Sequence, residues 1–178
     1  MSGHGVACVV LVVAGCASVA RAGTGPALAV PFFGQQKNGC GAASVAMVVH
    51  FWQHDAPGLQ AETPERVYQR LYRGDDRGIL LSDMRNYLEE AGLRAFTLRG
   101  NWADVERNVA RGRPLIVGLK RRREGGMHFA VVVGVEGNQV WLNDPTRRKA
   151  TRMRQEKFAR QWELAGRWLL LAAPAAGN

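Results

Sequence analysis

The 178-residue chain lacks any apolar run of the ~18 residues that a membrane-spanning helix needs, which excludes a polytopic membrane protein. It also lacks internal repeats and low-complexity segments. Hydrophobic residues make up 47% of the chain and charged residues 22%, an ordinary globular composition that excludes wholesale disorder and a collagen-like or coiled-coil rod. The length therefore predicts one domain that can build a hydrophobic core without a metal or a disulfide.

Residues 1–22 have the pattern of a signal peptide. Residues 6–14 form a short apolar run, and residues 20–22 (Ala-Arg-Ala) match a signal-peptidase site. Residues 13–16 (Val-Ala-Gly-Cys) also resemble a lipobox, in which Cys16 would be lipidated. We therefore expect an exported protein, either periplasmic or anchored to the membrane as a lipoprotein. The alternative is a structural N-terminal strand.

Cysteine is scarce, and export would leave Cys40 without a disulfide partner. Cys8 would be removed with the signal peptide, and Cys16 would be lipidated or removed. An unpaired cysteine in an oxidising compartment is either a reactive thiol or a small buried hydrophobic residue. The cysteine count alone leaves both interpretations of Cys40 open.

The spacing of apolar residues predicts mainly helices in the first half of the chain and mainly strands in the second. The predicted helices span residues 42–52, 64–72, 82–91, 103–110 and 155–162. The predicted strands span residues 94–98, 114–119, 128–135, 140–143 and 168–172. Residues 42–52 have almost no polar position, which is typical of a central buried helix, and Ser82 is an expected N-cap. This order predicts an α+β domain with an antiparallel sheet at residues 30–172, between a flexible lead-in at 23–29 and a tail at 173–178.

Cys40 begins the predicted buried helix and follows a polar loop that contains glycine. A helix N-terminus presents free N–H groups and partial positive charge, and both favour the nucleophilic thiolate over the thiol. Gly39 and Gly41 flank Cys40, and such small neighbours are expected to let a substrate backbone approach the sulfur. This pattern favours Cys40 as a nucleophile.

A thiolate nucleophile also needs a base and a group that orients the base. His50 and His54 lie ten or more residues beyond Cys40, roughly 15 Å or more along a helix, which is too far to touch the thiol. Their spacing could hold a metal, but no third ligand is evident, and they suit the C-terminus of a helix as cations. Because the remaining histidine outside the signal peptide is His128, it is the candidate base. Asp144, at the end of the next strand, is the candidate orienting group.

Two glutamines precede the candidate nucleophile by five and four residues, Gln35 and Gln36. A glutamine amide at this position can donate an N–H to an oxyanion, together with the backbone N–H of Cys40. Two donors and a thiolate at one helix N-terminus suit acyl transfer. The spacing alone leaves both glutamines open for this role.

Taken together, Gln35, Cys40-Gly41, His128 and Asp144-Pro145 resemble the papain-like bacteriocin-processing peptidases. Those domains cleave leader peptides after a double glycine and are usually fused to an ABC exporter. The resemblance covers about residues 28–172 and is strongest at residues 30–35 (Val-Pro-Phe-Phe-Gly-Gln) and at Cys40-Gly41.

The resemblance implies a papain-like cysteine peptidase fold and a role for each matching residue. Cys40 would be the nucleophile, His128 the base, Asp144 the orienting group and Gln35 the oxyanion donor, with no cofactor or metal. The chain looks like a stand-alone exported member, with a peptide or protein substrate and a separate ABC exporter as partner. Two alternatives are another acyl-transfer or amidase activity on cell-wall peptides and a catalytically silent peptide-binding module.

Acidic residues are scarce in one region, residues 111–160. This region holds 13 of the 24 Lys and Arg residues but 4 of the 15 acidic ones, and the whole chain has a formal net charge of +9. Such a local patch indicates either a solvated surface or contact with an acidic substrate or an anionic envelope surface. Nucleic acid is not expected, because the region contains no recognised module and no regular aromatic interleaving. The patch should lie beside the active site.

The hairpin that joins His128 to Asp144 gives one geometric prediction. Side chains alternate faces along a strand, so a regular two-residue turn at residues 137–138 would put Asp144 on the face away from His128. A three-residue loop at 136–138 would put both on one face as diagonal neighbours. We therefore expect an odd register, or an equivalent bulge, between Val135 and Gln139.

Overall fold

The computed structural model describes residues 27–74, 78–120 and 126–175. The helices are α1 (Cys40–Gln53), α2 (Pro64–Leu71), α3 (Leu81–Glu90), α4 (Trp102–Ala110) and α5 (Gln155–Leu164). The strands are β1 (Leu93–Arg99), β2 (Leu115–Leu119), β3 (His128–Glu136), β4 (Gln139–Asn143), β5 (Thr151–Arg154) and β6 (Trp168–Pro174). Within the described residues, no helix is both long and apolar enough to cross a membrane.

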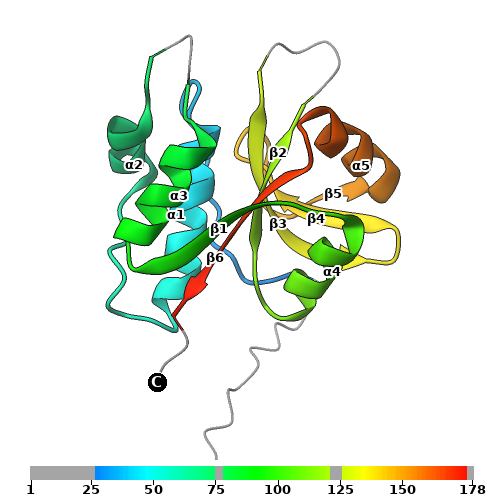
Figure 1. Cartoon of the computed structure of the whole chain (residues 1–178), viewed down its shortest axis with the longest axis horizontal. Helices are drawn as coiled ribbons and strands as arrows, with labels where there is room; N and C mark the ends of the chain where they lie inside the picture. Colours follow the sequence, from blue (N-terminus) through cyan, green and yellow to red (C-terminus); the bar gives the residue numbers. More distant parts are fainter. Residues whose placement is uncertain (1–26, 75–77, 121–125, 176–178) are drawn as a thin grey trace, which may run out of the picture.

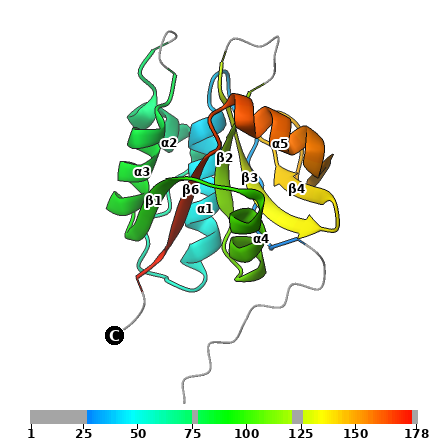
Figure 2. The ribbon, with the colours of Figure 1, turned by 45° about the vertical axis from the view of Figure 1, so that its right-hand side comes forward.

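The strands form one antiparallel sheet in the order β1-β6-β2-β3-β4-β5. The last strand of the chain, β6, lies between β1 and β2, so the C-terminal segment joins the two halves of the sheet. Helices α1, α2 and α3 lie together on one side, and α4 and α5 pack on the other (Figure 1). Figure 2 shows the same separation after a turn of 45°. The predicted α+β fold is therefore confirmed.

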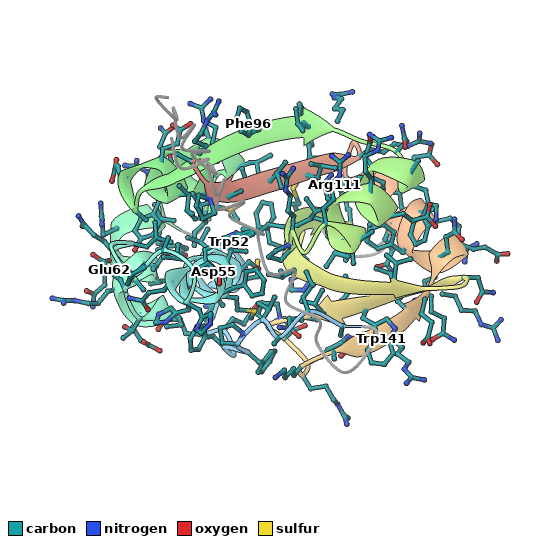
Figure 3. The ribbon with its side chains drawn as sticks, turned by 90° about the horizontal axis from the view of Figure 1, so that it is seen from below. Trp52, Asp55, Glu62, Phe96, Arg111 and Trp141 are labelled. Carbon is teal, nitrogen blue, oxygen red and sulfur yellow. The ribbon has the colours of Figure 1, made fainter. Side chains whose placement is uncertain are left out.

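A hydrophobic core lies on each side of the sheet. On the α1 side, ten of the fourteen residues of α1 are buried, which confirms the predicted central helix. Trp52 on this helix points toward β6, and its indole N–H donates to the Ala172 carbonyl at 2.8 Å (Figure 3). On the other side, Phe158 and Trp162 of α5 and Val105 of α4 pack against β2, β3 and β4. Strands β2 and β3, at the centre of the sheet, are thus buried on both faces. For β3 this is what its nearly continuous β-branched sequence predicts.

The local structure differs from the sequence expectation at three places. Helix α3 begins at Leu81, and its N-cap is Leu80 without a side-chain hydrogen bond, so Ser82 is not the cap. Strand β5 is unexpected, because its four residues include two exposed arginines and pair with β4 only at the edge of the sheet. The end of the supposedly flexible lead-in is attached to β3, since the Leu28 N–H donates to the Val133 carbonyl at 2.6 Å. The proposed signal peptide at 1–22 lies outside the described residues.

Candidate active site

Cys40 is the first residue of α1, where the N-cap Gly39 makes no side-chain hydrogen bond to the helix. Its free thiol is half-buried and opens into a cleft of about 730 Å³. Gln35 and His128 also line this cleft. Its walls carry the apolar side chains of Ile79, Leu80, Leu81, Met127, Phe129 and Trp168. The cleft thus brings the candidate nucleophile, base and oxyanion donor to one surface.

The two glycines beside Cys40 serve packing within the protein. A Cβ on Gly41 would lie 2.9 Å from Ile79 Cγ2 and 3.1 Å from Met84 Sδ. A Cβ on Gly39 would lie 3.1 Å from the Gln36 carbonyl oxygen. Both glycines are buried, so the expectation that they admit a substrate backbone is wrong. They let the loop and α3 close around the start of α1.

His128 bridges Cys40 and Asp144. Its Nε2 lies 2.7 Å from Asp144 Oδ1, and its ring also interacts with the Cys40 thiol. An ionised carboxylate only accepts hydrogen bonds, so Nε2 carries a proton and its N–H donates a hydrogen bond to Asp144 Oδ1. Nδ1 is then the ring nitrogen that is left for proton exchange with Cys40. The three residues meet in space in the order that the sequence predicts, from three separate elements.

Groups other than His128 also hold the Asp144 carboxylate in place. Its Oδ1 accepts hydrogen bonds from the Thr146 backbone N–H at 3.0 Å and from the Thr146 hydroxyl at 2.7 Å. The Nε of Arg147 lies 3.3 Å from Oδ2. Asp144 itself is only 3% exposed. These contacts fix the carboxylate and, through it, the orientation of the imidazole.

The protonation states of the His128–Asp144 pair follow from burial and from these contacts. Burial alone would lower the pKa of His128, but hydrogen bonds to Asp144 and Cys40 outweigh it and raise the pKa to about 9. Burial would raise the pKa of Asp144, but hydrogen bonds from His128 and Thr146 lower it to about 2. At neutral pH the imidazole is therefore protonated and Asp144 is ionised.

A β-bulge puts Asp144 on the same face of the sheet as His128. The hairpin turn has two residues, with Glu136 opposite Gln139 and with Gly137 at φ 56°, so the expected three-residue loop is wrong. The register then shifts by one residue between Val132 and Gly134, after which Val131 lies opposite Asn143. An equivalent bulge was expected between Val135 and Gln139, but it lies earlier in β3, at Val133.

The structure distinguishes the two glutamines. Gln35 lines the cleft with Cys40, whereas Gln36 is exposed and does not line it. Gln35 Oε1 is buried and has no hydrogen-bond partner among the described residues. The backbone N–H of Gln35 donates to the Pro145 carbonyl at 3.1 Å, which ties this loop to the turn that carries Asp144.

Sequence reasoning missed a second tie between the same two segments. Asn143 is fully buried, and its Nδ2 lies 3.3 Å from the Val30 carbonyl and 3.5 Å from the Pro31 carbonyl. Its Oδ1 accepts a hydrogen bond from the Ala150 N–H at 2.8 Å. A buried polar residue next to a candidate site residue is a signal that could have indicated this role. The sequence also did not indicate that Thr146 and Arg147 are the hydrogen-bond and ion-pair partners of Asp144.

His50, at the other end of α1, has its own partners within the protein. His50 Nε2 lies 3.2 Å from the Glu62 carbonyl, and the His50 ring packs edge-on against Phe33 at 5.1 Å. Within residues 27–74, 78–120 and 126–175, no three His, Cys, Asp or Glu side chains are grouped so that they could hold a metal ion.

This α+β fold, with its cysteine at a helix N-terminus facing a histidine on the sheet, is that of the papain-like peptidases. The model of the peptidase C39-like family matches residues 27–169, and the chain belongs to that family. None of the curated protein sequences matches the chain.

Solved structures show the same fold at low sequence identity. A double glycine motif protease from an AMS/PCAT transporter, in complex with its leader peptide, is 22% identical with a TM-score of 0.65, over 84% of this chain and 94% of that one. The peptidase domain of Streptococcus ComA, a bifunctional ABC transporter, is 20% identical with a TM-score of 0.63, over 85% and 100%. A C39-like peptidase from Bacillus anthracis is 16% identical with a TM-score of 0.64, over 85% and 98%.

Proposed function

We propose that this member of the family is an active cysteine peptidase, with Cys40 as nucleophile, His128 as general base and acid, and Asp144 as the orienting group. The observation that carries the proposal is the position of His128, which lines the cleft with Cys40, interacts with its thiol and lies 2.7 Å from Asp144 Oδ1. A silent binding module has no need of this chain of contacts or of an imidazole that is protonated at neutral pH. The complete set therefore favours catalysis over binding alone.

The mechanism follows from the protonation states. His128 holds the proton taken from Cys40, and the thiolate attacks the carbonyl carbon of the scissile peptide bond. The backbone N–H of Cys40 and the side-chain amide of Gln35 donate to the oxyanion that forms. Nδ1 of His128 then protonates the leaving amine, the C–N bond breaks, and a thioester to Cys40 remains. Water attacks the thioester after giving a proton to His128, and Cys40 is released.

The substrate that we propose is a peptide cleaved after two glycines. The related protease solved with a leader peptide is a double glycine motif protease, and that likeness supports the class of substrate. Leu80 and Met127, each 42% exposed, flank the cleft with apolar surface that suits apolar residues of such a peptide. A separate ABC exporter is the proposed partner that would carry the processed peptide.

Hydrolysis of a fluorogenic peptide with an internal Gly-Gly tests the activity. Cys40→Ala should abolish turnover while leaving the folding transition unchanged, and His128→Ala should slow labelling of Cys40 by iodoacetamide. His54→Ala is the matched control, because His54 lies at the far end of α1, and it should leave both rates unchanged. Turnover that persists in Cys40→Ala would refute the mechanism. Slow labelling of the wild-type thiol would identify a silent binding module.

The oxyanion assignment has its own pair of variants. Gln35→Ala should lower kcat by about 10²–10³-fold, the usual cost of one oxyanion donor. Gln36→Ala should have little effect, because Gln36 is exposed outside the cleft. The reverse result would assign the role to Gln36. Hydrolysis of cell-wall peptides in place of the Gly-Gly peptide would identify the amidase alternative.

We also propose that the protein is exported, on the pattern of residues 1–22. The mature protein should fractionate outside the cytoplasm, and Cys16→Ala should release it from membranes if the lipobox is used. Membrane attachment that survives Cys16→Ala would leave cleavage after Ala22, with attachment through the basic region, as the explanation.

A further inference from the structure

A concave surface, which we call the basic groove, lies between β5 and the first turns of α5. Its volume is about 400 Å³, and five of its nine lining residues are cations. These cations are Arg147, Arg152, Arg154, Lys157 and Arg160, and the acid among the lining residues is Glu156. The groove therefore gathers much of the positive charge of residues 111–160 in one hollow.

Three of the five cations in the basic groove have no carboxylate partner among the described residues, whereas Arg147 pairs with Asp144. Arg154, Lys157 and Arg160 are exposed, and none has an ion pair with the rest of the described chain. Arg152 lies over the Trp141 ring at 4.2 Å. By contrast, Arg70 on α2 bonds to two carboxylates, those of Glu62 and Glu90. Clustered cations without such partners repel one another, and an anionic ligand removes that repulsion.

The basic groove adjoins the candidate active site. Arg147 lines the groove, and its Nε lies 3.3 Å from Oδ2 of Asp144, whose other oxygen holds His128. One side chain thus separates the groove from the His128–Asp144 pair. A peptide that extends beyond the cleft past His128 is within reach of this hollow.

We propose that the basic groove binds an acidic segment of the peptide substrate, one that carries several Asp or Glu side chains. This inference rests on the peptidase function proposed above and adds a second determinant of specificity to it. The shape favours a peptide, because a hollow accepts a chain, whereas a bilayer surface contacts flat or convex faces. Membrane-bound surfaces also bury apolar anchors, and the apolar side chain in the lining is the half-buried Met153.

Binding of a fluorescein-labelled hexaglutamate peptide to the full chain, measured by fluorescence anisotropy, tests the proposal. The protein carries Cys40→Ala, so the result needs no turnover. The groove variant combines Arg154→Gln, Lys157→Gln and Arg160→Gln, and leaves Arg147 and Arg152 with their partners. The matched control removes the same charge on α2, α3 and β1, with Arg66→Gln, Arg85→Gln and Arg94→Gln.

The groove variant should weaken hexaglutamate binding about tenfold, because three exposed ion pairs are lost. The control variant should bind as the parent does, a hexaglutamine probe should not bind, and about 0.5 M salt should abolish binding. Equal weakening by both variants, or no binding of hexaglutamate, would overturn the proposal. So would groove-dependent binding of phosphatidylglycerol vesicles in the absence of hexaglutamate binding, because the ligand would then be a lipid surface.

A second measurement connects the basic groove to catalysis in the protein with Cys40 intact. Four glutamates added to one end of the Gly-Gly reporter peptide should lower KM severalfold without changing kcat, and the groove variant should lose that gain. A tail at either end that leaves KM unchanged would overturn the link to the substrate. If no reporter is cleaved while hexaglutamate binding still depends on the groove, the proposed peptidase function fails and the acidic-peptide site remains.

Discussion

Asp144 is the residue on which the geometry of the candidate site depends. Four donors converge on its buried carboxylate: His128 Nε2, the backbone N–H and hydroxyl of Thr146, and Arg147 Nε. A buried charge is stable only when it is paired and hydrogen-bonded, and here both conditions are met. Thr146 fixes the orientation of the Asp144 carboxylate. The His128 imidazole therefore has one orientation in which its Nε2–H can donate to Oδ1.

The first prediction concerns the titration of His128. The pKa of His128 is raised to about 9, so its ring should titrate near pH 9 in the folded protein, as measured by NMR of the ring carbon-bound protons. Asp144→Asn removes the negative charge that favours the imidazolium. The titration should then move down toward 6.5, and hydrolysis should fall strongly with it. The His128→Ala spectrum assigns the resonance.

The same shift has a consequence for stability. Since the pKa of His128 is higher in the folded state than in the unfolded state, its contribution is complete below pH 6.5 and is lost as the pH rises toward 9. The pKa of Asp144 is lowered, so its contribution is present above pH 3.8 and is lost as the pH falls toward 2. A wild-type His128 that titrates near 6.5 would contradict the statement about His128.

At the scale of elements, the start of α1 is fixed by close contact with the segment before α3. Ile79 and Met84 occupy the space where a Cβ on Gly41 would lie. Ile79 also lines the cleft, so the same contact shapes the surface beside Cys40. The position of the Cys40 thiol therefore depends on the packing of an apolar residue, Ile79.

The second prediction is that Gly41→Ala destabilises the fold and slows hydrolysis. Overpacking of this kind costs about 1–3 kcal/mol, more than the ~1 kcal/mol that alanine gains over glycine in a helix. Urea unfolding measures the loss. Gly58→Ala is the control, because a Cβ there meets nothing within 4 Å. Adding Ile79→Ala to Gly41→Ala should recover part of the rate; no recovery would mean that the contact with Ile79 is not the cause.

Asn143 connects β4 to the segment that leads to Gln35. Its side-chain amide reaches the carbonyls of Val30 and Pro31, while its oxygen accepts from Ala150. Together with the bond from the Gln35 N–H to the Pro145 carbonyl, it holds the loop that carries Gln35 against the turn that carries Asp144. The two halves of the candidate site are thus fastened to each other through the end of one strand.

The third prediction follows from this connection. Asn143→Ala leaves buried donors and acceptors unpaired and should cost about 1–3 kcal/mol in the free energy of unfolding. Its effect on kcat/KM should not add to that of Gln35→Ala. Asn143→Ala acts by displacing the Gln35 amide, and in Gln35→Ala that amide is already absent. Asn108→Ala, which removes one bond within α4, is the control and should combine additively with Gln35→Ala. Full additivity for Asn143 would limit it to a role in stability.

At the scale of the whole molecule, the C-terminal strand holds the two sides together. Strand β6 pairs with β1 on one side and β2 on the other, and its residues enter both hydrophobic cores. Trp52 adds a direct bond from α1 to this strand. The cleft is lined by the start of α1, the segment before α3 and the starts of β3 and β6, so its shape depends on how firmly α1 is joined to the sheet.

The fourth prediction tests that joint. Trp52→Phe removes the indole N–H from the Ala172 carbonyl and should lower the free energy of unfolding by about 1–2 kcal/mol. Trp102→Phe is the matched change, because Trp102 packs against Phe158 in the other core and no hydrogen bond of its indole is found within the described residues. Urea unfolding should show a smaller loss for Trp102→Phe. Equal losses would mean that ring volume, and not the hydrogen bond, sets the cost.

Much of the fold could be predicted from local sequence because its signals are local. The nearly polar-free run after Cys40 predicts the buried helix, Thr63 and Pro64 begin α2, and the β-branched run at 128–135 predicts the central strand. The candidate site residues could also be predicted by type and order. Cys40, His128 and Asp144 follow from the chemistry that a thiolate nucleophile requires.

The face on which Asp144 lies was decided only by the tertiary structure. Gly137 and Asn138 are compatible with either a two-residue or a three-residue turn, so the local sequence does not determine the register. The bulge at Val133 does, and it is held by residues more than a hundred positions earlier: Ala27 bridges to Gly134, and Leu28 bonds to the Val133 carbonyl. Thr146 and Asn143 gained their roles in the same way, because their partners are defined only once the hairpin has its register.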